Sequence, residues 1–312
     1  MENSKGNIFQ NPYLVTALAL FSCFLWGSAF PTIKVGYELF AISGSNTYGK
    51  ILFAGYRFFL AAFLILTFCL LTGREIKIRK GQIKGLLLLG LLQTAINYTF
   101  FYIGVSNISG TKGSILSATG TLFSVLLAHF FYKEDKLTKK KIIGLIVGFS
   151  GVVLVNINGG DVGGGFSLTG EGFVLMASLT GAISGIYTKA LARHINTFLI
   201  TAYQLLIGSL FLISVGFLGG AQSLTFTGQN IWLLLYLSFL SAAAFSIWTI
   251  LLKHNGVGKV SIYKFTVPIF GTFLSYIILK ERLLGTNTIL AIILVSLSII
   301  LINIDRVKKS ST

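Results

Sequence analysis

Residues 113–132 read GSILSATGTLFSVLLAHFFY and are followed by Lys133-Glu134, and residues 260–279 read VSIYKFTVPIFGTFLSYIIL and are followed by Lys280-Glu281. Both stretches are long and apolar, and Lys264 is the only Lys, Arg, Asp or Glu in either of them. An α-helix needs about 20 such residues to cross the hydrocarbon core of a bilayer. The two stretches therefore predict two membrane-spanning helices that end on the same dipeptide.

The composition of the whole chain supports this reading. Hydrophobic types make up 54% of the 312 residues and charged types only 11%, whereas a soluble domain carries about 25% charged residues. A soluble protein and a disordered chain are both excluded, since disorder requires low hydrophobicity. The net charge of +16 is better explained by Lys and Arg that flank spans than by nucleic-acid binding.

Ten apolar windows stand out along the chain. Most of them are too long for the strands of a membrane barrel and show no alternation of period two. Helices satisfy their own backbone groups in lipid, so the sequence predicts an all-α integral membrane protein with ten transmembrane helices. The windows cover residues 13–33, 51–72, 84–105, 113–132, 142–158, 170–190, 197–218, 230–252, 260–279 and 286–304.

The distribution of Lys and Arg predicts the orientation. With ten spans, 19 of these residues fall in segments on the same side as the N-terminus and 6 on the other side. Since cytoplasmic loops carry the excess of Lys and Arg, both termini are predicted to be cytoplasmic.

The two halves of the chain resemble each other. Tyr56 and Tyr203, Ser124 and Gly271, and the two Lys-Glu dipeptides are all separated by 147 positions. Five spans per half is an odd number, so the second half must enter the membrane from the opposite side. We therefore predict two inverted five-helix repeats, residues 1–158 and 159–312, an architecture associated with alternating-access transporters.

Several short motifs, taken in order, resemble the EamA-type drug/metabolite transporter superfamily. They are residues 25–30 (LWGSAF), 56–58 (YRF), 95–98 (AINY), 133–134 (KE) and 261–271 (SIYKFTVPIFG). The resemblance implies ten helices around a central cavity and the movement of small metabolites across the cell membrane. Thr121 departs from the pattern, because its repeat partner is Pro268; the two halves are expected to bend unequally.

Lys264 is the most informative charge, because it lies about five residues inside its span. Pro268 has no N–H, so the carbonyl of residue 264 loses its helical partner. Lys264 is read either as a substrate or gating contact or as a side chain that snorkels to the headgroups. The family resemblance implies that Arg57 is a structural anchor, with contact to cargo as the alternative. Pro268 and Gly271 are assigned structural or gating roles.

The remaining candidates are polar and aromatic residues that share helix faces. We expect them to line the central cavity, and the alternative is packing between helices. With Lys264, the predicted cavity residues are Trp26, Gln93, Asn97, Phe101, Ser184, Tyr187 and Trp248.

Missing features narrow the function. All nine acidic residues lie in loops, tails or span ends, so neutral, amino-acid-like or anionic cargo is favoured over organic cations. No P-loop or H-E-x-x-H motif occurs, and we predict no catalytic residue, metal or cofactor.

The sequence thus predicts a secondary transporter that works in export across the plasma membrane, is of bacterial origin and is present as a monomer or homodimer. A membrane enzyme acting on lipid head groups and a sensor or assembly subunit remain the alternatives.

Overall fold

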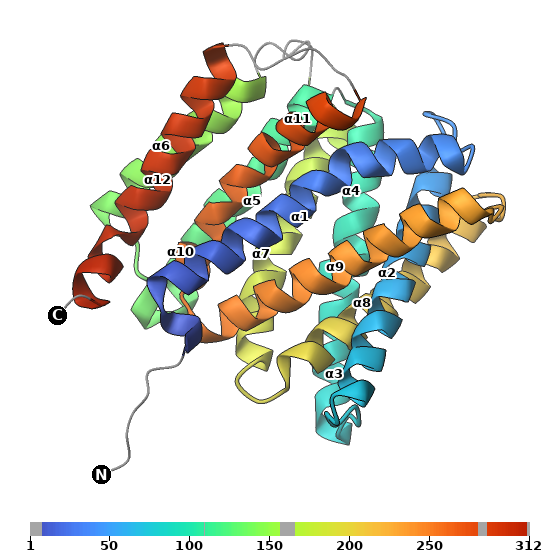
Figure 1. The fold of residues 1–312 in the computed structure, drawn as a ribbon, viewed down its shortest axis with the longest axis horizontal. Coiled ribbons are helices and arrows are strands. Elements are labelled where there is room, and N and C mark those ends of the chain that lie inside the picture. Colours follow the sequence, from blue (N-terminus) through green and yellow to red (C-terminus); the bar gives the residue numbers. More distant parts are fainter. Residues whose placement is uncertain (1–7, 109, 157–165, 280–285, 311–312) are drawn as a thin grey trace.

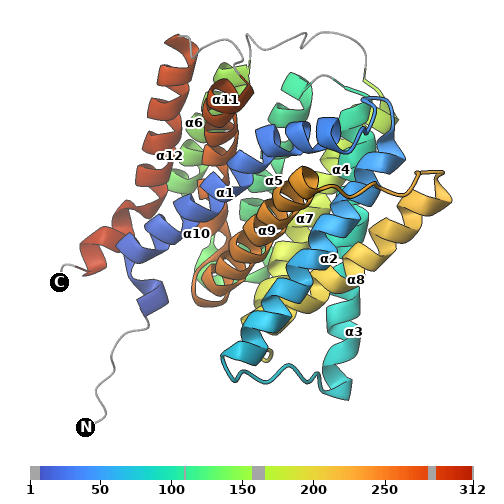
Figure 2. The same ribbon diagram turned by 45° about the vertical axis from the view of Figure 1, so that its right-hand side comes forward.

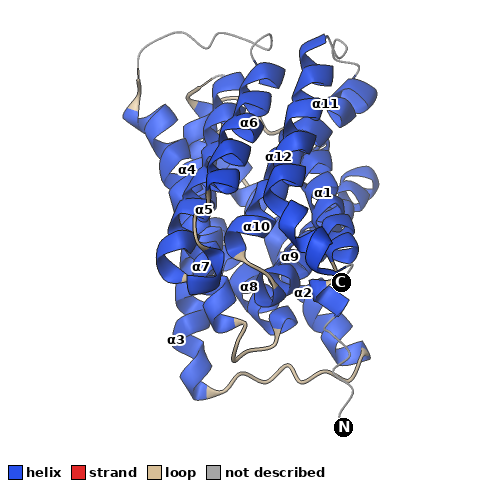
Figure 3. Cartoon of the chain, turned by 90° about the vertical axis from the view of Figure 1, so that its left-hand side faces the viewer, coloured by secondary structure: helices blue, strands red, loops and turns tan. Residues whose placement is uncertain are grey.

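The computed structural model describes residues 8–108, 110–156, 166–279 and 286–310, and all regular elements in these ranges are helical (Figures 1 and 3). The α-helices are α1 (Pro12–Leu39), α2 (Thr47–Leu71), α3 (Lys80–Leu89), α4 (Asn97–Ser106), α5 (Gly110–Phe131), α6 (Lys139–Asn156), α7 (Phe173–Leu191), α8 (Thr197–Leu218), α9 (Gly228–His254), α10 (Val257–Ser261), α11 (Thr266–Leu279) and α12 (Thr286–Ser310). Short 3₁₀ segments are η1 (Ile8–Gln10), η3 (Lys133–Asp135) and η5 (Ile262–Phe265), and π-helical segments are η2 (Gly90–Ile96) and η4 (Leu168–Gly172).

Seven helical stretches in the described residues are long and apolar enough to cross a membrane. The prediction of an all-helical, multi-pass membrane protein is therefore confirmed, and the exact number of ten spans stays a prediction. The seven stretches are Pro12–Leu39, Thr47–Leu71, Lys80–Ser106, Leu168–Leu191, Thr197–Leu218, Gly228–His254 and Val257–Leu279, and two shorter apolar stretches are Leu116–Phe131 and Ile289–Ile302.

The helices pack mainly against partners that are distant in sequence. Helix α1 lies between α9 and α11, α2 packs on α8 and α9, and α5 packs on α7. Helices α6 and α12 pair with each other at one edge of the bundle, where Figures 1 and 2 show them side by side. The core is thus built from contacts between the N-terminal and C-terminal parts of the chain.

Two of the apolar stretches are irregular in their middle. The stretch from α3 to α4 passes through η2, and the stretch from α10 to α11 passes through η5. Segment η5 contains Lys264, whose carbonyl Pro268 leaves without an N–H partner. Helix α5 carries Thr121 at the position that the sequence pairs with Pro268, and it continues without a break.

Asparagine side chains fix where several helices begin. Asn11 accepts hydrogen bonds from the N–H groups of Tyr13 and Leu14, and Asn46 and Asn196 cap α2 and α8 in the same way. Each cap satisfies N–H groups that the first turn of a helix leaves free.

A buried ion pair joins the α5–α6 connection to the start of α10. Asp135 is fully buried, and its Oδ1 lies 2.5 Å from the Nζ of Lys141. Its Oδ2 accepts a hydrogen bond of 2.7 Å from the N–H of Gly258. The neighbouring Glu134 lies in the same segment, η3, whereas its predicted counterpart Glu281 lies outside the described residues.

Replacing Asp135 should destabilise the bundle strongly. Asp135→Asn leaves the Lys141 ammonium buried without an opposite charge, and removing one partner of a buried pair costs about 3 kcal/mol or more. The measurement is the unfolding midpoint of the purified protein in detergent. Glu75→Gln is the matched control, because Glu75 is exposed and forms no ion pair with the described residues; equal destabilisation by the two variants would contradict this role for Asp135.

Candidate functional site

Three of the predicted cavity residues meet where α1, α9 and η5 come together. The Nζ of Lys264 lies 5.0 Å from the ring centroid of Trp248 and 5.7 Å from that of Trp26. The two indole rings are themselves 5.0 Å apart. Aromatic faces attract a cation through their quadrupole. The two rings therefore compensate in part for the hydration that the ammonium group of Lys264 loses inside the protein.

The backbone that carries Lys264 is fixed against α1. The buried Tyr263 shares a hydrogen bond of 2.7 Å between its hydroxyl and that of Thr16. The carbonyl of Tyr263 accepts from the Sγ of Cys23 at 3.3 Å and from the Oγ1 of Thr266 at 2.7 Å. Side chains therefore supply partners for a turn that lacks regular helical bonds.

Arg57 forms a second cationic centre, between α2 and α9, and this one is buried. Its side chain is 3% exposed, and its Nε donates a hydrogen bond of 2.7 Å to the Oγ of Ser241. The guanidinium carbon lies 4.9 Å from the ring centroid of Phe58. Among the described residues, neither Arg57 nor Lys264 has a carboxylate within ion-pair distance.

A continuous series of ring contacts joins the two cations, and we call it the aromatic chain. Trp26 contacts Phe245 at 5.5 Å between centroids, and Phe245 lies 6.2 Å from Phe58. Phe58 contacts Tyr98 at 4.5 Å, and Tyr98 lies 6.4 Å from Phe101. The aromatic chain consists of Trp248, Trp26, Phe245, Phe58, Tyr98 and Phe101.

Other candidates lie apart from the two cations and contact α7 or belong to it. The Nδ2 of Asn97 donates 2.6 Å to the carbonyl of Ala177 on α7. The Oγ of Ser184 donates 2.8 Å to the carbonyl of Thr180 within its own helix. Tyr187 packs with the cluster formed by α3 and α8, and Gln93 is half-buried in η2. These contacts are those expected of helix packing.

Pro268 and Gly271 lie on α11, beside the aromatic chain. A Cβ added to Gly27 of α1 would lie 2.5 Å from the Cβ of Phe270 and 3.0 Å from the backbone nitrogen of Gly271. The two glycines therefore permit α1 and α11 to approach each other closely at the level of Trp26.

Sequence reasoning did not single out Phe58, Tyr98 or Tyr263 for the site. Phe58 and Tyr98 stand inside the motifs YRF and AINY, directly beside Arg57 and Asn97. The chain contains 27 Phe and 12 Tyr, so an aromatic residue in a span is weak evidence by itself. Only the arrangement of the helices shows which rings touch.

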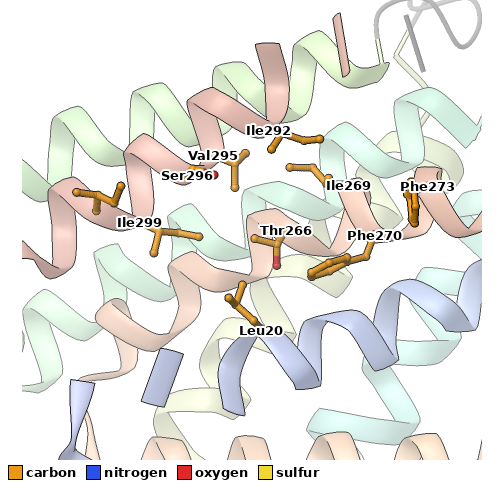
Figure 4. A pocket seen from close by; sticks show the side chains of 10 residues that line it. Leu20, Thr266, Ile269, Phe270, Phe273, Ile292, Val295, Ser296 and Ile299 are labelled. Atoms are coloured by element: carbon orange, nitrogen blue, oxygen red, sulfur yellow. The ribbon is translucent and has the colours of Figure 1, made fainter. Parts of the chain in front are cut away.

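A separate crevice of about 400 Å³ lies between α1, α11 and α12 (Figure 4). Its lining is almost entirely aliphatic or aromatic, and Thr266 and Ser296 are the polar residues in it. The hydroxyl of Thr266 is engaged with the carbonyl of Tyr263. Such a lining offers little to orient a polar solute, so we place the candidate site at the aromatic chain and its two cations.

Comparison with known proteins agrees with this architecture. The model of the EamA-like transporter family matches residues 14–157 and again residues 168–304. The chain belongs to the EamA-like transporter family. Because its relatives are transporters, membership supports a membrane transporter rather than an enzyme.

Individual relatives match over most of their length. The uncharacterized transporters YoaV and YvbV of Bacillus subtilis are 26% and 29% identical, covering 87% and 94% of this chain and 90% and 93% of their own. The chloroplastic WAT1-related protein At3g02690 of Arabidopsis thaliana is 24% identical over 95% of this chain and 73% of its own. A solved crystal structure with 15% identity has a TM-score of 0.77, covers 95% of this chain and 98% of its own, and shares the fold.

The close approach of α1 and α11 can be tested with glycine variants. Gly→Ala in a helix normally gains about 1 kcal/mol, but Gly27→Ala should lower the unfolding midpoint, because the new Cβ collides with Phe270. Gly185→Ala is the control, since no atom lies within 4 Å of its added Cβ, and it should leave the midpoint unchanged or raise it. If Gly27→Ala proved as stable as the control, the close contact of α1 with α11 would be wrong.

Proposed function

We propose that this protein is a secondary transporter that moves small, amino-acid-like, neutral or anionic solutes across the plasma membrane by alternating access, in the direction of export. The observation that carries the proposal is the pair of cations on the aromatic chain: the half-buried Lys264 at its Trp248–Trp26 end and the buried Arg57 beside Phe58. A carboxylate of the solute would complement a cation, and an apolar or aromatic part would lie against the rings.

Two inverted repeats, residues 1–158 and 159–312, form part of the proposal, with both termini cytoplasmic. The helix contacts support it. In the proposed repeat, α1 is equivalent to α7, α5 to α11 and α4 to α9. The contact between α1 and α11 then corresponds to the contact between α7 and α5, and the contact between α1 and α9 corresponds to the contact between α7 and α4. The helices α2 and α8 are equivalent to each other, as are α6 and α12, and each of these pairs is in contact. The two matches to one family model are a second support.

The buried polar groups follow the same repeat. Adding 147 to Arg57 gives Gln204, and subtracting 147 from Ser241 gives Thr94. Arg57 and Ser241 bond to each other, whereas the Oε1 of Gln204 and the Oγ1 of Thr94 are buried without a partner. A buried unpaired polar atom costs about 1–3 kcal/mol. In the opposite-facing arrangement of an inverted repeat, these groups would exchange surroundings and could gain partners.

Transport requires the aromatic chain to open. The contacts between Trp26, Trp248 and Phe245 leave the rings touching in this structure. A solute that reaches Lys264 must separate them, and its own contacts with the rings and the ammonium then replace the ones lost. Binding energy of this kind is what shifts a transporter between its conformations.

Flux through proteoliposomes tests the proposal. Lys264→Gln keeps a polar side chain, one atom shorter, and removes the charge, so flux of an anionic solute should fall on the order of tenfold, the equivalent of one charge-assisted contact. Flux of a neutral solute of similar size should fall much less. Lys84→Gln, which removes an exposed charge far from the aromatic chain, should change neither.

The same vesicles distinguish the competing functions. Flux without added nucleotide supports a secondary transporter. Chemical turnover of a lipid without flux would identify an enzyme, and the absence of both would indicate a sensor or assembly subunit. An equal loss for anionic and neutral solutes in Lys264→Gln would contradict the assignment of Lys264 to anionic cargo.

A further inference from the structure

A second hollow lies at the end of the bundle where α7 and α9 finish and α1 and α10 begin. It has a volume of about 570 Å³, and we call it the basic pocket. It is lined by Gln10, Pro12, Glu134, Lys189, Arg193, Lys253, His254, Asn255, Gly256 and Lys259. It is separate from the aromatic chain, since the two share no residue.

The charges around the basic pocket are unbalanced. Four of its residues are Lys or Arg, and Glu134 is its only carboxylate. Lys189 already uses that carboxylate, at 3.1 Å, and its Nζ also lies 4.3 Å from the ring centroid of Tyr132. A hollow lined by one sign of charge attracts ions of the other sign.

Two of the cations form no ion pair with the described residues. Arg193 contacts the ring of Tyr132 at 5.6 Å, and among the described residues no carboxylate pairs with it. Lys253 is exposed and has no hydrogen bond or ion pair with the described residues. Both can therefore turn toward a bound anion without breaking an existing pair.

The titration of Glu134 agrees with a positive environment. Its pKa lies below the usual value, chiefly because its own backbone N–H donates to the carboxylate, with further contributions from the hydrogen bond and charge of Lys189 and the charge of Arg193. Glu134 thus stays ionised and holds Lys189 in place, which leaves Arg193 and Lys253 to bind a ligand.

The wall of the basic pocket is built by tertiary contacts. The Nδ2 of Asn255 donates 2.9 Å to the carbonyl of Phe9 and 3.0 Å to that of Leu251. The rings of Phe9 and His254 stack at 5.6 Å between centroids. The segment before α1 is therefore attached to the end of α9, and the shape of the hollow does not depend on a ligand.

We propose that the basic pocket binds a phosphate group, carried either by a small soluble phosphoester or by the headgroup of an anionic lipid. The planar fork of Arg193 suits the oxygens of a phosphate, and Lys253 adds a second donor from the end of α9. The volume falls within the range of small-molecule sites and exceeds what a bare phosphate ion needs. Binding would join the ends of α7 and α9 through one ligand. The inference does not rest on the proposed transport activity.

The test is binding to the purified full-length protein at constant ionic strength. In detergent, inorganic phosphate replaces chloride and the melting midpoint is recorded. In a second arm, nanodiscs of phosphatidylglycerol are compared with nanodiscs of phosphatidylcholine. A ligand that binds only the folded state raises the midpoint, so we expect an increase in at least one arm. An increase with phosphate identifies a soluble phosphoester site, and an increase confined to phosphatidylglycerol identifies a headgroup site.

The double variant Arg193→Gln/Lys253→Gln should weaken that binding by on the order of tenfold or more, as expected for the loss of charge-assisted hydrogen bonds. The matched control is Lys77→Gln/Lys84→Gln, which removes the same charge from exposed residues outside the basic pocket and should bind as the unaltered protein does. The proposal is overturned if neither arm stabilises the unaltered protein, or if the two double variants lose binding equally. Size-exclusion profiles of the ligand-free variants confirm that both remain folded.

Discussion

Lys264 and Arg57 are charges held inside an apolar bundle without a carboxylate beside either of them in the described part of the chain. A Lys or Arg at the centre of a spanning helix costs about 2.5–3.5 kcal/mol even on the most lenient scales. Aromatic faces, the hydroxyl of Ser241 and the irregular turn at η5 offset part of that cost. The two costly charges are joined by ring contacts at the meeting of the N-terminal and C-terminal helices, and the proposed transport function explains them by a solute that binds there.

Much of the fold was predictable because the lipid core imposes a length and a composition on each span. The apolar windows coincide with helices, and the position of the η5 break was predictable because Pro268 removes one specific N–H. Trp26, Trp248 and Lys264 were named as cavity residues, but their mutual contact depends on how α1 crosses α9, which periodicity does not determine. The periodicity of a sequence identifies which face of a helix is apolar, but it does not identify the helix that packs against that face.

Other contacts in the structure could not be predicted for the same reason, because they depend on which helices are neighbours. Asn97 is on a face that contacts another helix, and its amide is engaged by the carbonyl of Ala177, because any amide in lipid takes the nearest acceptor. Asp135 and Lys141 looked like ordinary loop charges in a basic segment, yet both are buried and joined to α10. The basic pocket could not be read from the sequence either, since its residues come from four distant segments.

The account depends on the interior of the bundle becoming accessible from each side of the membrane in turn. Ser246 of α9 is a suitable reporter, because it is buried one residue from Phe245 and its hydroxyl has no partner. The measurement is labelling of Ser246→Cys by a membrane-impermeant thiol reagent applied to either face of vesicles, with Cys23 and Cys69 replaced by Ala.

Leu71→Cys and Leu218→Cys calibrate the sidedness of the vesicles. These exposed residues end α2 and α8, which run antiparallel, since Phe68 contacts Phe198 and Gly219 contacts Tyr48. Each control should therefore react from one face only. The account predicts that Ser246→Cys reacts from both faces; labelling from a single face, or from neither, would contradict it.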